Sequence, residues 1–176
     1  MKKMLALILP AALVGCTLSS DLRLVLTNQN AKTEFYTTEF APVGNKVPVA
    51  CENLNGVPTS TQVTIGFNYT GNFKEAHIVL SDPASNNYNS GEVTFAKDSE
   101  NLGFDKGYYN ALFSLNSIKP VPTKYASARA PREVVVGSAA KVGSFNGLVW
   151  AYSDTGSRTP DARTNQIDVY ENCTLK

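Results

Sequence analysis

The sequence predicts an all-β protein, folded as an antiparallel sandwich of about 8–10 short strands over residues 21–176. Three observations support this fold class. Short segments rich in Val, Thr, Tyr and Phe are separated by Gly, Asn, Asp and Pro, which is the composition of strands and turns. Within several segments apolar and polar residues alternate, as in strands with one face in the core. After the first sixteen residues the chain shows neither helical periodicity nor an internal repeat.

The clearest strand covers residues 61–70. Its apolar side chains fall on one face, at Val63, Ile65, Phe67 and Tyr69. Gly71-Asn72 then offers a tight turn, and alternation resumes at Ala76, Ile78 and Leu80. We therefore expect residues 61–81 to form a β-hairpin, with His77 on its polar face.

The other strands are shorter or less regular. Alternation begins at residues 22–26, and further candidate strands cover 92–96, 107–115, 133–136, 147–152 and 165–173. Residues 82–90 and 97–106 are polar and predict loops. Residues 119–131, bounded by prolines, form the longest connection without a pattern, and we expect one helical turn within it at 125–129.

The first fifteen residues have the composition of a secretory signal. Lys2 and Lys3 precede an apolar run from Met4 to Val14, a basic region followed by a hydrophobic one. The run is too short for a membrane helix, which needs roughly 20 apolar residues. Leu13-Val14-Gly15-Cys16 resembles the lipobox of bacterial lipoprotein precursors. The alternatives are a secretory signal in which Cys16 is incidental, and a buried core helix.

The lipoprotein resemblance implies cleavage before Cys16 and attachment of acyl chains such as palmitate to it. Residues 1–15 would be the signal peptide, 16–20 the lipidated N-terminus with a short tether, and 21–176 a single domain. The exported protein would be held on a bacterial cell membrane through this lipid, with no indication of which membrane. A tether of five residues reaches at most about 17 Å, so the domain would lie close to the membrane.

The cysteine count favours one disulfide. The chain has three cysteines, and if Cys16 carries lipid, Cys51 and Cys173 form the remaining pair in a compartment where disulfides persist. By parity, Cys51 shares a face with Val49 and Cys173 shares one with Val169. Two separate buried thiols are the alternative. Trp150 comes long after Cys51, unlike the tryptophan of immunoglobulin domains, so an immunoglobulin-like architecture is an analogy only.

Charge gives no sign of a nucleic-acid or anionic-lipid partner. The chain has 16 basic and 15 acidic residues, and without Lys2 and Lys3 the balance is 14 to 15, a net charge of −1. The densest basic group, Lys124, Arg129 and Arg132, lies in the proline-bounded connection. We expect it to be part of a solvated loop.

One motif resembles the signature of a catalytic site. Asp154-Thr155-Gly156-Ser157 resembles the Asp-Thr-Gly-Ser/Thr signature of aspartic proteases, in which two such aspartates share a proton. This chain has one copy, and only 22 residues follow Asp154. The motif therefore predicts a turn that ends a strand.

Metal and cofactor sites are not expected. His77 is the one histidine, and its predicted position is an exposed strand face, so no multi-histidine site can form. Residues Asp98–Asp105 have the composition of a calcium loop, but Leu102 stands at the fifth position of an EF-hand register. A solvated acidic loop is the expectation, and a calcium site of another type stays open.

The functional hypothesis is a non-catalytic binding or envelope-assembly module for a surface protein or glycan. The chain lacks a phosphate-binding glycine loop after a strand and a recognisable pair of carboxylates. Four tyrosines could form a surface that contacts a sugar or peptide, Tyr88, Tyr108, Tyr109 and Tyr125. The alternative is a small lipid-anchored hydrolase that uses Asp154.

Overall fold

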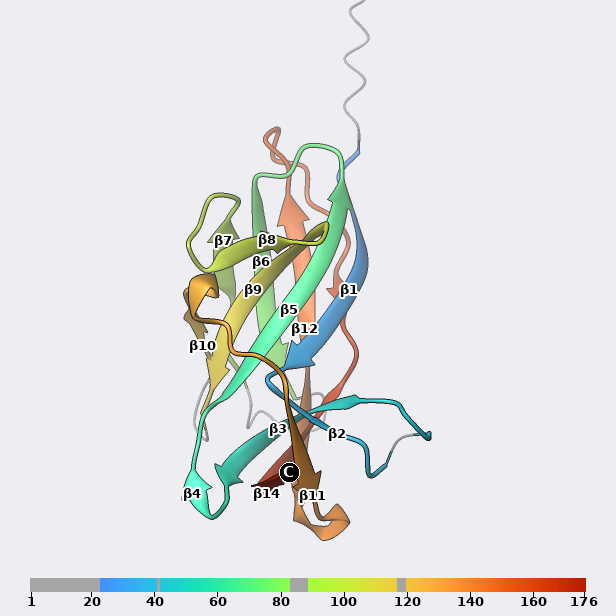
Figure 1. The fold of residues 1–176 in the computed structure, drawn as a ribbon. Coiled ribbons are helices and arrows are strands. Elements are labelled where there is room, and N and C mark those ends of the chain that lie inside the picture. Colours follow the sequence, from blue (N-terminus) through green and yellow to red (C-terminus); the bar gives the residue numbers. More distant parts are fainter. Residues whose placement is uncertain (1–22, 41, 83–88, 117–119) are drawn as a thin grey trace, which may run out of the picture.

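The computed structural model describes residues 23–40, 42–82, 89–116 and 120–176. In these ranges the chain forms fourteen β-strands and two 3₁₀ turns, η1 (Tyr125–Ser127) and η2 (Ser138–Ala140), and no α-helix (Figure 1). None of the described segments is a helix long and apolar enough to cross a membrane. The signal peptide, Cys16 and the tether predicted from the sequence lie outside the described residues.

The strands form two sheets. The five-stranded sheet has the order β1-β5-β9-β10, with β8 also paired to β9. Its strands are β1 (Val25–Thr33), β5 (Thr61–Thr70), β8 (Leu102–Asp105), β9 (Tyr108–Leu115) and β10 (Pro120–Thr123). All pairs in this sheet are antiparallel. It forms the front layer of the molecule in Figure 1.

The nine-stranded sheet has the order β4-β3-β2-β11-β14-β12-β6-β7, with β13 paired to β12. Its strands are β2 (Phe35–Thr37), β3 (Val47–Leu54), β4 (Val57–Pro58), β6 (Glu75–Ser81), β7 (Val93–Ala96), β11 (Arg132–Val136), β12 (Lys141–Tyr152), β13 (Ala162–Arg163) and β14 (Ile167–Leu175). Because β3 also pairs with β14, strands β3, β2, β11 and β14 close into a small barrel. Two pairs in this barrel are parallel, β2 with β11 and β3 with β14.

The main core lies between the two sheets. Val63, Ile65 and Phe67 of β5 are fully buried, as the alternation predicted, and they share a cluster with Ile78 of β6 and Val149 of β12. The core therefore consists of residues from facing sheets, which is the arrangement of a β-sandwich. The sequence prediction of an all-β fold with antiparallel sheets is confirmed, but the described residues form fourteen strands instead of the 8–10 expected, and two strand pairs are parallel.

A second core fills the small barrel. Its buried residues come from the four barrel strands, and they are Phe35, Val49, Cys51, Val134, Val136, Tyr170 and Cys173. Cys51 and Cys173 form the predicted disulfide, with a Cα–Cα distance of 5.9 Å. The barrel and the C-terminus lie at the end of the molecule opposite to the first described residues (Figure 1). The disulfide thus joins an early strand to the last strand inside this second core.

Parity correctly predicted that both thiols are buried, but the expectation that Cys173 shares the face of Ile167 and Val169 was wrong. Ile167 and Val169 lie in the main core, whereas Tyr170 and Cys173 lie in the barrel. The reason is that β14 pairs with β12 over its first half and with β11 over its second. One strand therefore serves two cores.

The predicted hairpin over residues 61–81 was also wrong. β5 pairs with β1 and β9, while β6 pairs with β12 and β7, so the two strands belong to different sheets. The connection between them crosses the end of the sandwich and buries Phe73, which contacts Phe67 and Tyr69. Alternation correctly identified the apolar face of each strand. It could not assign the strands to a sheet, because both sheets turn an apolar face towards the same core.

Two connections that were predicted as loops contain strands. β8 lies within residues 97–106, and β10 lies at the start of residues 119–131. Both are four-residue strands on β9, too short to show a period. The helical turn expected at 125–129 is present as η1, over Tyr125–Ser127.

Removing the disulfide should destabilise the protein strongly. Cys51→Ala with Cys173→Ala releases a loop of 122 residues, and we expect the free energy of unfolding to fall by about 4–5 kcal/mol. Urea denaturation followed by tryptophan fluorescence measures this loss. The wild-type protein in reducing agent is the control and should show a similar loss. A difference under about 1 kcal/mol would contradict a structural role for this bond.

Candidate functional site

A strap formed by residues Lys124–Arg132 lies on the outer face of the five-stranded sheet. In Figure 1 it runs from η1 across β5 towards β11. Leu112 lies between the core residues Ala111 and Phe113 on β9 and so points outward, yet it is only 1% exposed, and η1 of the strap contacts β9 on this sheet. The strap therefore covers part of a face that alternation alone would leave to solvent.

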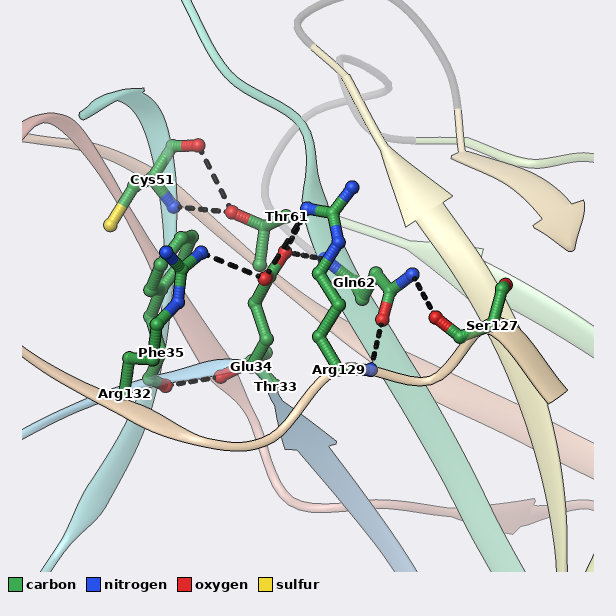
Figure 2. A network of polar contacts seen from close by, with 9 residues as sticks. All are labelled: Thr33, Glu34, Phe35, Cys51, Thr61, Gln62, Ser127, Arg129 and Arg132. Atoms are coloured by element: carbon green, nitrogen blue, oxygen red, sulfur yellow. Dashed lines mark hydrogen bonds and ion pairs between the residues drawn. The ribbon is translucent and has the colours of Figure 1, made fainter. Parts of the chain in front are cut away.

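The strap is fixed by a buried carboxylate, Glu34, the single residue between β1 and β2. Its side chain is 1% exposed. Oε1 accepts hydrogen bonds from the backbone N–H of Gln62 at 2.8 Å and from Arg129 Nη1 at 3.2 Å, and Oε2 accepts one from Arg132 Nη2 at 3.1 Å (Figure 2). A buried charge is tolerated only when it is paired and hydrogen-bonded. Here both oxygens are satisfied.

The Gln62 side chain holds the strap at a second point. Its Oε1 accepts a hydrogen bond from the backbone N–H of Arg129 at 2.7 Å, and its Nε2 donates to the carbonyl of Ser127 at 3.0 Å (Figure 2). The side-chain amide thus donates to one backbone carbonyl of the strap and accepts from one backbone N–H, which are the two kinds of hydrogen bond that a neighbouring strand would make. Gln62 therefore joins the strap to β5 much as a sheet ladder would.

Backbone contacts continue the network into the barrel. Arg132 N–H donates to the carbonyl of Glu34 at 2.7 Å, and the Arg132 guanidinium lies 4.8 Å from the centre of the Phe35 ring. The hydroxyl of Thr61 accepts a bond from Cys51 N–H at 2.9 Å and donates to the Cys51 carbonyl at 3.0 Å (Figure 2). The network thus connects the strap, the sandwich and the disulfide-bearing strand.

The strap borders a hollow of about 350 Å³, which we call the strap hollow. It is lined by Lys32, Thr33, Glu34, Gln62, Thr64, Asp105, Lys106, Asn110, Tyr125, Ala128, Arg129 and Pro131. These residues come from strands β1, β5, β8 and β9, from the β1–β2 junction at Glu34, from the β8–β9 turn and from the strap. Most are polar or charged, so the hollow suits a hydrated polar ligand better than an apolar one.

Tyr125 forms one wall of the strap hollow and is held flat against Gly103. A Cβ atom built on Gly103 would come within 1.8 Å of Tyr125 Cδ1, so only glycine lets the ring approach this closely. Burial raises the pKa of Tyr125, and the nearby Asp105 carboxylate adds to this effect. The ring is therefore fixed in place and neutral at physiological pH.

The structure separates the four tyrosines that the sequence grouped together. Tyr125 lines the strap hollow, and Tyr108 lies on the same face of the sheet, with Lys32 Nζ 6.0 Å from the centre of its ring. Tyr109 points to the opposite face, where it contacts Phe67, Phe73 and Tyr69. Burial, followed by a hydrogen bond to Tyr69, raises its pKa to about 12. Tyr88 lies outside the described residues.

Asp154 lies in an exposed turn at the end of β12. Gly156 N–H donates to the carbonyl of Ser153 at 3.0 Å, and Ser153 N–H donates to that of Ser157 at 2.9 Å. Gly156 has φ of +83°, the left-handed region that glycine adopts freely. The turn borders a hollow of about 280 Å³ lined by Arg23, Ser157 and Arg158 among others, with no carboxylate among its described residues.

His77 is less exposed than the sequence predicted. It lies on the outer face of β6, as expected, but its side chain is only 12% exposed. The ring stacks beside Trp150, with centroids 5.5 Å apart, and meets Tyr152 edge-on at 5.0 Å. Its Nδ1 is 2.7 Å from Glu92 Oε1. Large aromatic neighbours on the adjacent strand β12 cover it, which alternation within one strand cannot show.

The loop arginines were expected to lie in a solvated loop, and their side chains are indeed about half exposed, Arg129 at 51% and Arg132 at 41%. Arg129 and Arg132 pair with buried Glu34. Lys124 is exposed and pairs with Glu100, and this hydrogen bond lowers the pKa of the Glu100 carboxyl. Within the described ranges, no group of three or more His, Cys, Asp or Glu side chains could hold a metal ion, and the Asp98–Asp105 segment is included in this finding.

The network residues Glu34 and Gln62 were missed by sequence reasoning. A signal for them existed, since three basic residues in one proline-bounded connection call for a counter-charge, but nothing in the sequence identifies which of 15 acidic residues supplies it. Comparison with protein-family models, with curated proteins and with solved structures finds no match for this chain.

Replacing the buried carboxylate should release the strap. In Glu34→Gln, Arg129 and Arg132 lose their counter-charge, and we expect unfolding to become easier by about 1–3 kcal/mol, since both guanidinium groups are half exposed and partly screened. Limited trypsin digestion should also cut faster after Arg129. The control, Glu100→Gln, removes an exposed pair on the same strap and should change neither measurement. Equal behaviour of the two variants would contradict the role assigned to Glu34.

Proposed function

We propose that this protein is a non-catalytic binding module of a bacterial cell envelope, anchored by lipid on Cys16, and that the strap hollow is where it holds its partner. The partner is a surface protein or a glycan. The observation that carries this proposal is that a buried ionic network holds one wall of a polar hollow in place. Because this wall is already ordered, little further conformational entropy is lost when a ligand binds.

The dimensions of the strap hollow support a ligand site. Its volume of about 350 Å³ falls in the range of small-ligand pockets, about 300–1,000 Å³. Arg129 has one face on Glu34 and is about half exposed on the other side. A charged side chain that is already fixed by an ion pair loses little further conformational entropy when it binds a ligand.

The anchoring part of the proposal rests on the lipobox resemblance and on the placement of the chain. The described chain begins at the end of the sandwich opposite to the barrel (Figure 1). A lipid on Cys16 would therefore hold that end near the membrane and leave the flank with the strap hollow accessible. The hydrolase alternative finds less support, because Asp154 is exposed in a turn.

The first test concerns the anchor. The mature protein extracted from bacterial membranes should begin at Cys16 and carry the added mass of its acyl chains, because a thiol at the lipobox position is the acceptor for lipid. Intact-mass spectrometry measures this. Cys16→Ser is the control, and it should leave the precursor unprocessed and the lipid absent. A mature N-terminus elsewhere, or an unmodified Cys16, would contradict the anchoring.

The second test concerns the strap hollow. A photoreactive residue in place of Lys106, at its rim, should cross-link an envelope component in intact cells. The matched position is Arg163 on β13, exposed on the opposite sheet, and it should not capture the same component. Mass spectrometry of the adducts identifies the partner. Equal capture from both positions, or capture only of cytoplasmic proteins, would count against the proposal.

A further inference from the structure

We infer that the ligand of the strap hollow is an acidic saccharide, a sugar that carries a carboxylate or phosphate group. This inference rests on the proposed function and narrows its partner to one chemical class. Three features of the strap hollow support it: its charge balance, its polar lining and its fixed aromatic wall.

Positive charge is in excess around the strap hollow. Three basic residues, Lys32, Lys106 and Arg129, line it against two acidic ones, Glu34 and Asp105. Outside the lining, Arg132 adds a further cation on Glu34. Glu34 is 1% exposed and already binds both arginines. A ligand therefore meets Lys32, Lys106 and the open side of Arg129, with Asp105 as the one exposed carboxylate among the lining residues. The mature chain has a net charge of −1, so this excess is local.

The polar lining favours a sugar over a protein. Asn110 and Thr64, on the neighbouring strands β9 and β5, line the strap hollow, and amide and hydroxyl groups can both donate to and accept from sugar hydroxyls. Protein interfaces are instead centred on buried aromatic or aliphatic anchors. None of the large apolar side chains exposed on the described residues lines the strap hollow.

The aromatic wall of the strap hollow, Tyr125, is also suited to a sugar ring. Gly103 holds one face of the Tyr125 ring, and the ring borders the strap hollow. An aromatic face packs well against the apolar C–H face of a sugar ring, while its edge hydroxyl stays hydrated. An acidic sugar would thus place its ring on Tyr125 and its anionic group near Lys32, Lys106 or Arg129.

Binding to matched saccharides tests the inference. The probes are trigalacturonic acid and its neutral methyl ester, 3′-sialyllactose and lactose, and glucose 1-phosphate and glucose, with inorganic phosphate alone. Calorimetry should show at least one acidic probe binding about tenfold or more tightly than its neutral counterpart and than phosphate. Differences between the carboxylate and phosphate pairs then identify the anionic group.

Variants locate the binding. Lys32→Gln with Lys106→Gln should weaken the acidic probe about tenfold or more, whereas Lys74→Gln with Lys97→Gln, which removes the same charge outside the lining, should change it less than about twofold. Tyr125→Phe should retain binding and Tyr125→Ala should lose it. Circular dichroism of each variant confirms folding.

Three outcomes would overturn the inference. They are equal binding of acidic and neutral probes, equal effects of the two lysine pairs, and the absence of any saccharide binding. If no saccharide binds while cross-linking from position 106 captures an envelope protein, the acidic saccharide is excluded and the binding module stands. If neither experiment finds a partner, both proposals fail.

Discussion

The burial of one carboxylate, Glu34, is the constraint on which the rest of the site depends. It occupies the single position between β1 and β2, where the chain leaves the sandwich for the barrel, and its side chain is 1% exposed. An unpaired charge there would cost several kcal/mol. Arg129 and Arg132 must therefore approach from a segment about 95 residues later, and in doing so they fix the strap that borders the hollow. A single electrostatic requirement thus determines both the junction and the shape of the site.

The disulfide has a comparable role on the other side of this junction. The barrel core holds seven buried residues, two of which are the bonded cysteines, and so small a core contributes limited hydrophobic stabilisation. Cross-linking Cys51 to Cys173 offsets this by restricting the unfolded chain. Thr61 bonds both backbone groups of Cys51 and lies next to Gln62, whose side chain holds the strap. The covalent and ionic constraints therefore act on adjacent residues, and the barrel and the strap are held together.

Sequence reasoning succeeded where the physical signal is local or can be counted. The strand at 61–70 followed from alternation, and the disulfide followed from three cysteines once one was assigned to lipid. Sequence reasoning failed where a strand or side chain pairs with a residue far away in the sequence. Alternation at 76–80 does not say which sheet the strand joins, and the pairing of Glu34 with Arg129 leaves no pattern in the chain. Tyr108 and Tyr109 are a different case, because neighbouring residues of a strand point to opposite faces, so their separation could have been predicted from their numbers alone.

The position of the strap hollow relative to the proposed lipid anchor limits which partners can reach it. The described chain starts at one end of the sandwich and the barrel closes the other, while the strap crosses the face between them (Figure 1). With a lipid on Cys16 and a short tether, the long direction of the molecule would stand away from the membrane and the strap hollow would open sideways. A ligand that reaches it must then run along the envelope surface or project from the same membrane. An acidic glycan chain at that surface meets this condition, because it can lie across the face of the sheet and needs to insert only one sugar beside Tyr125.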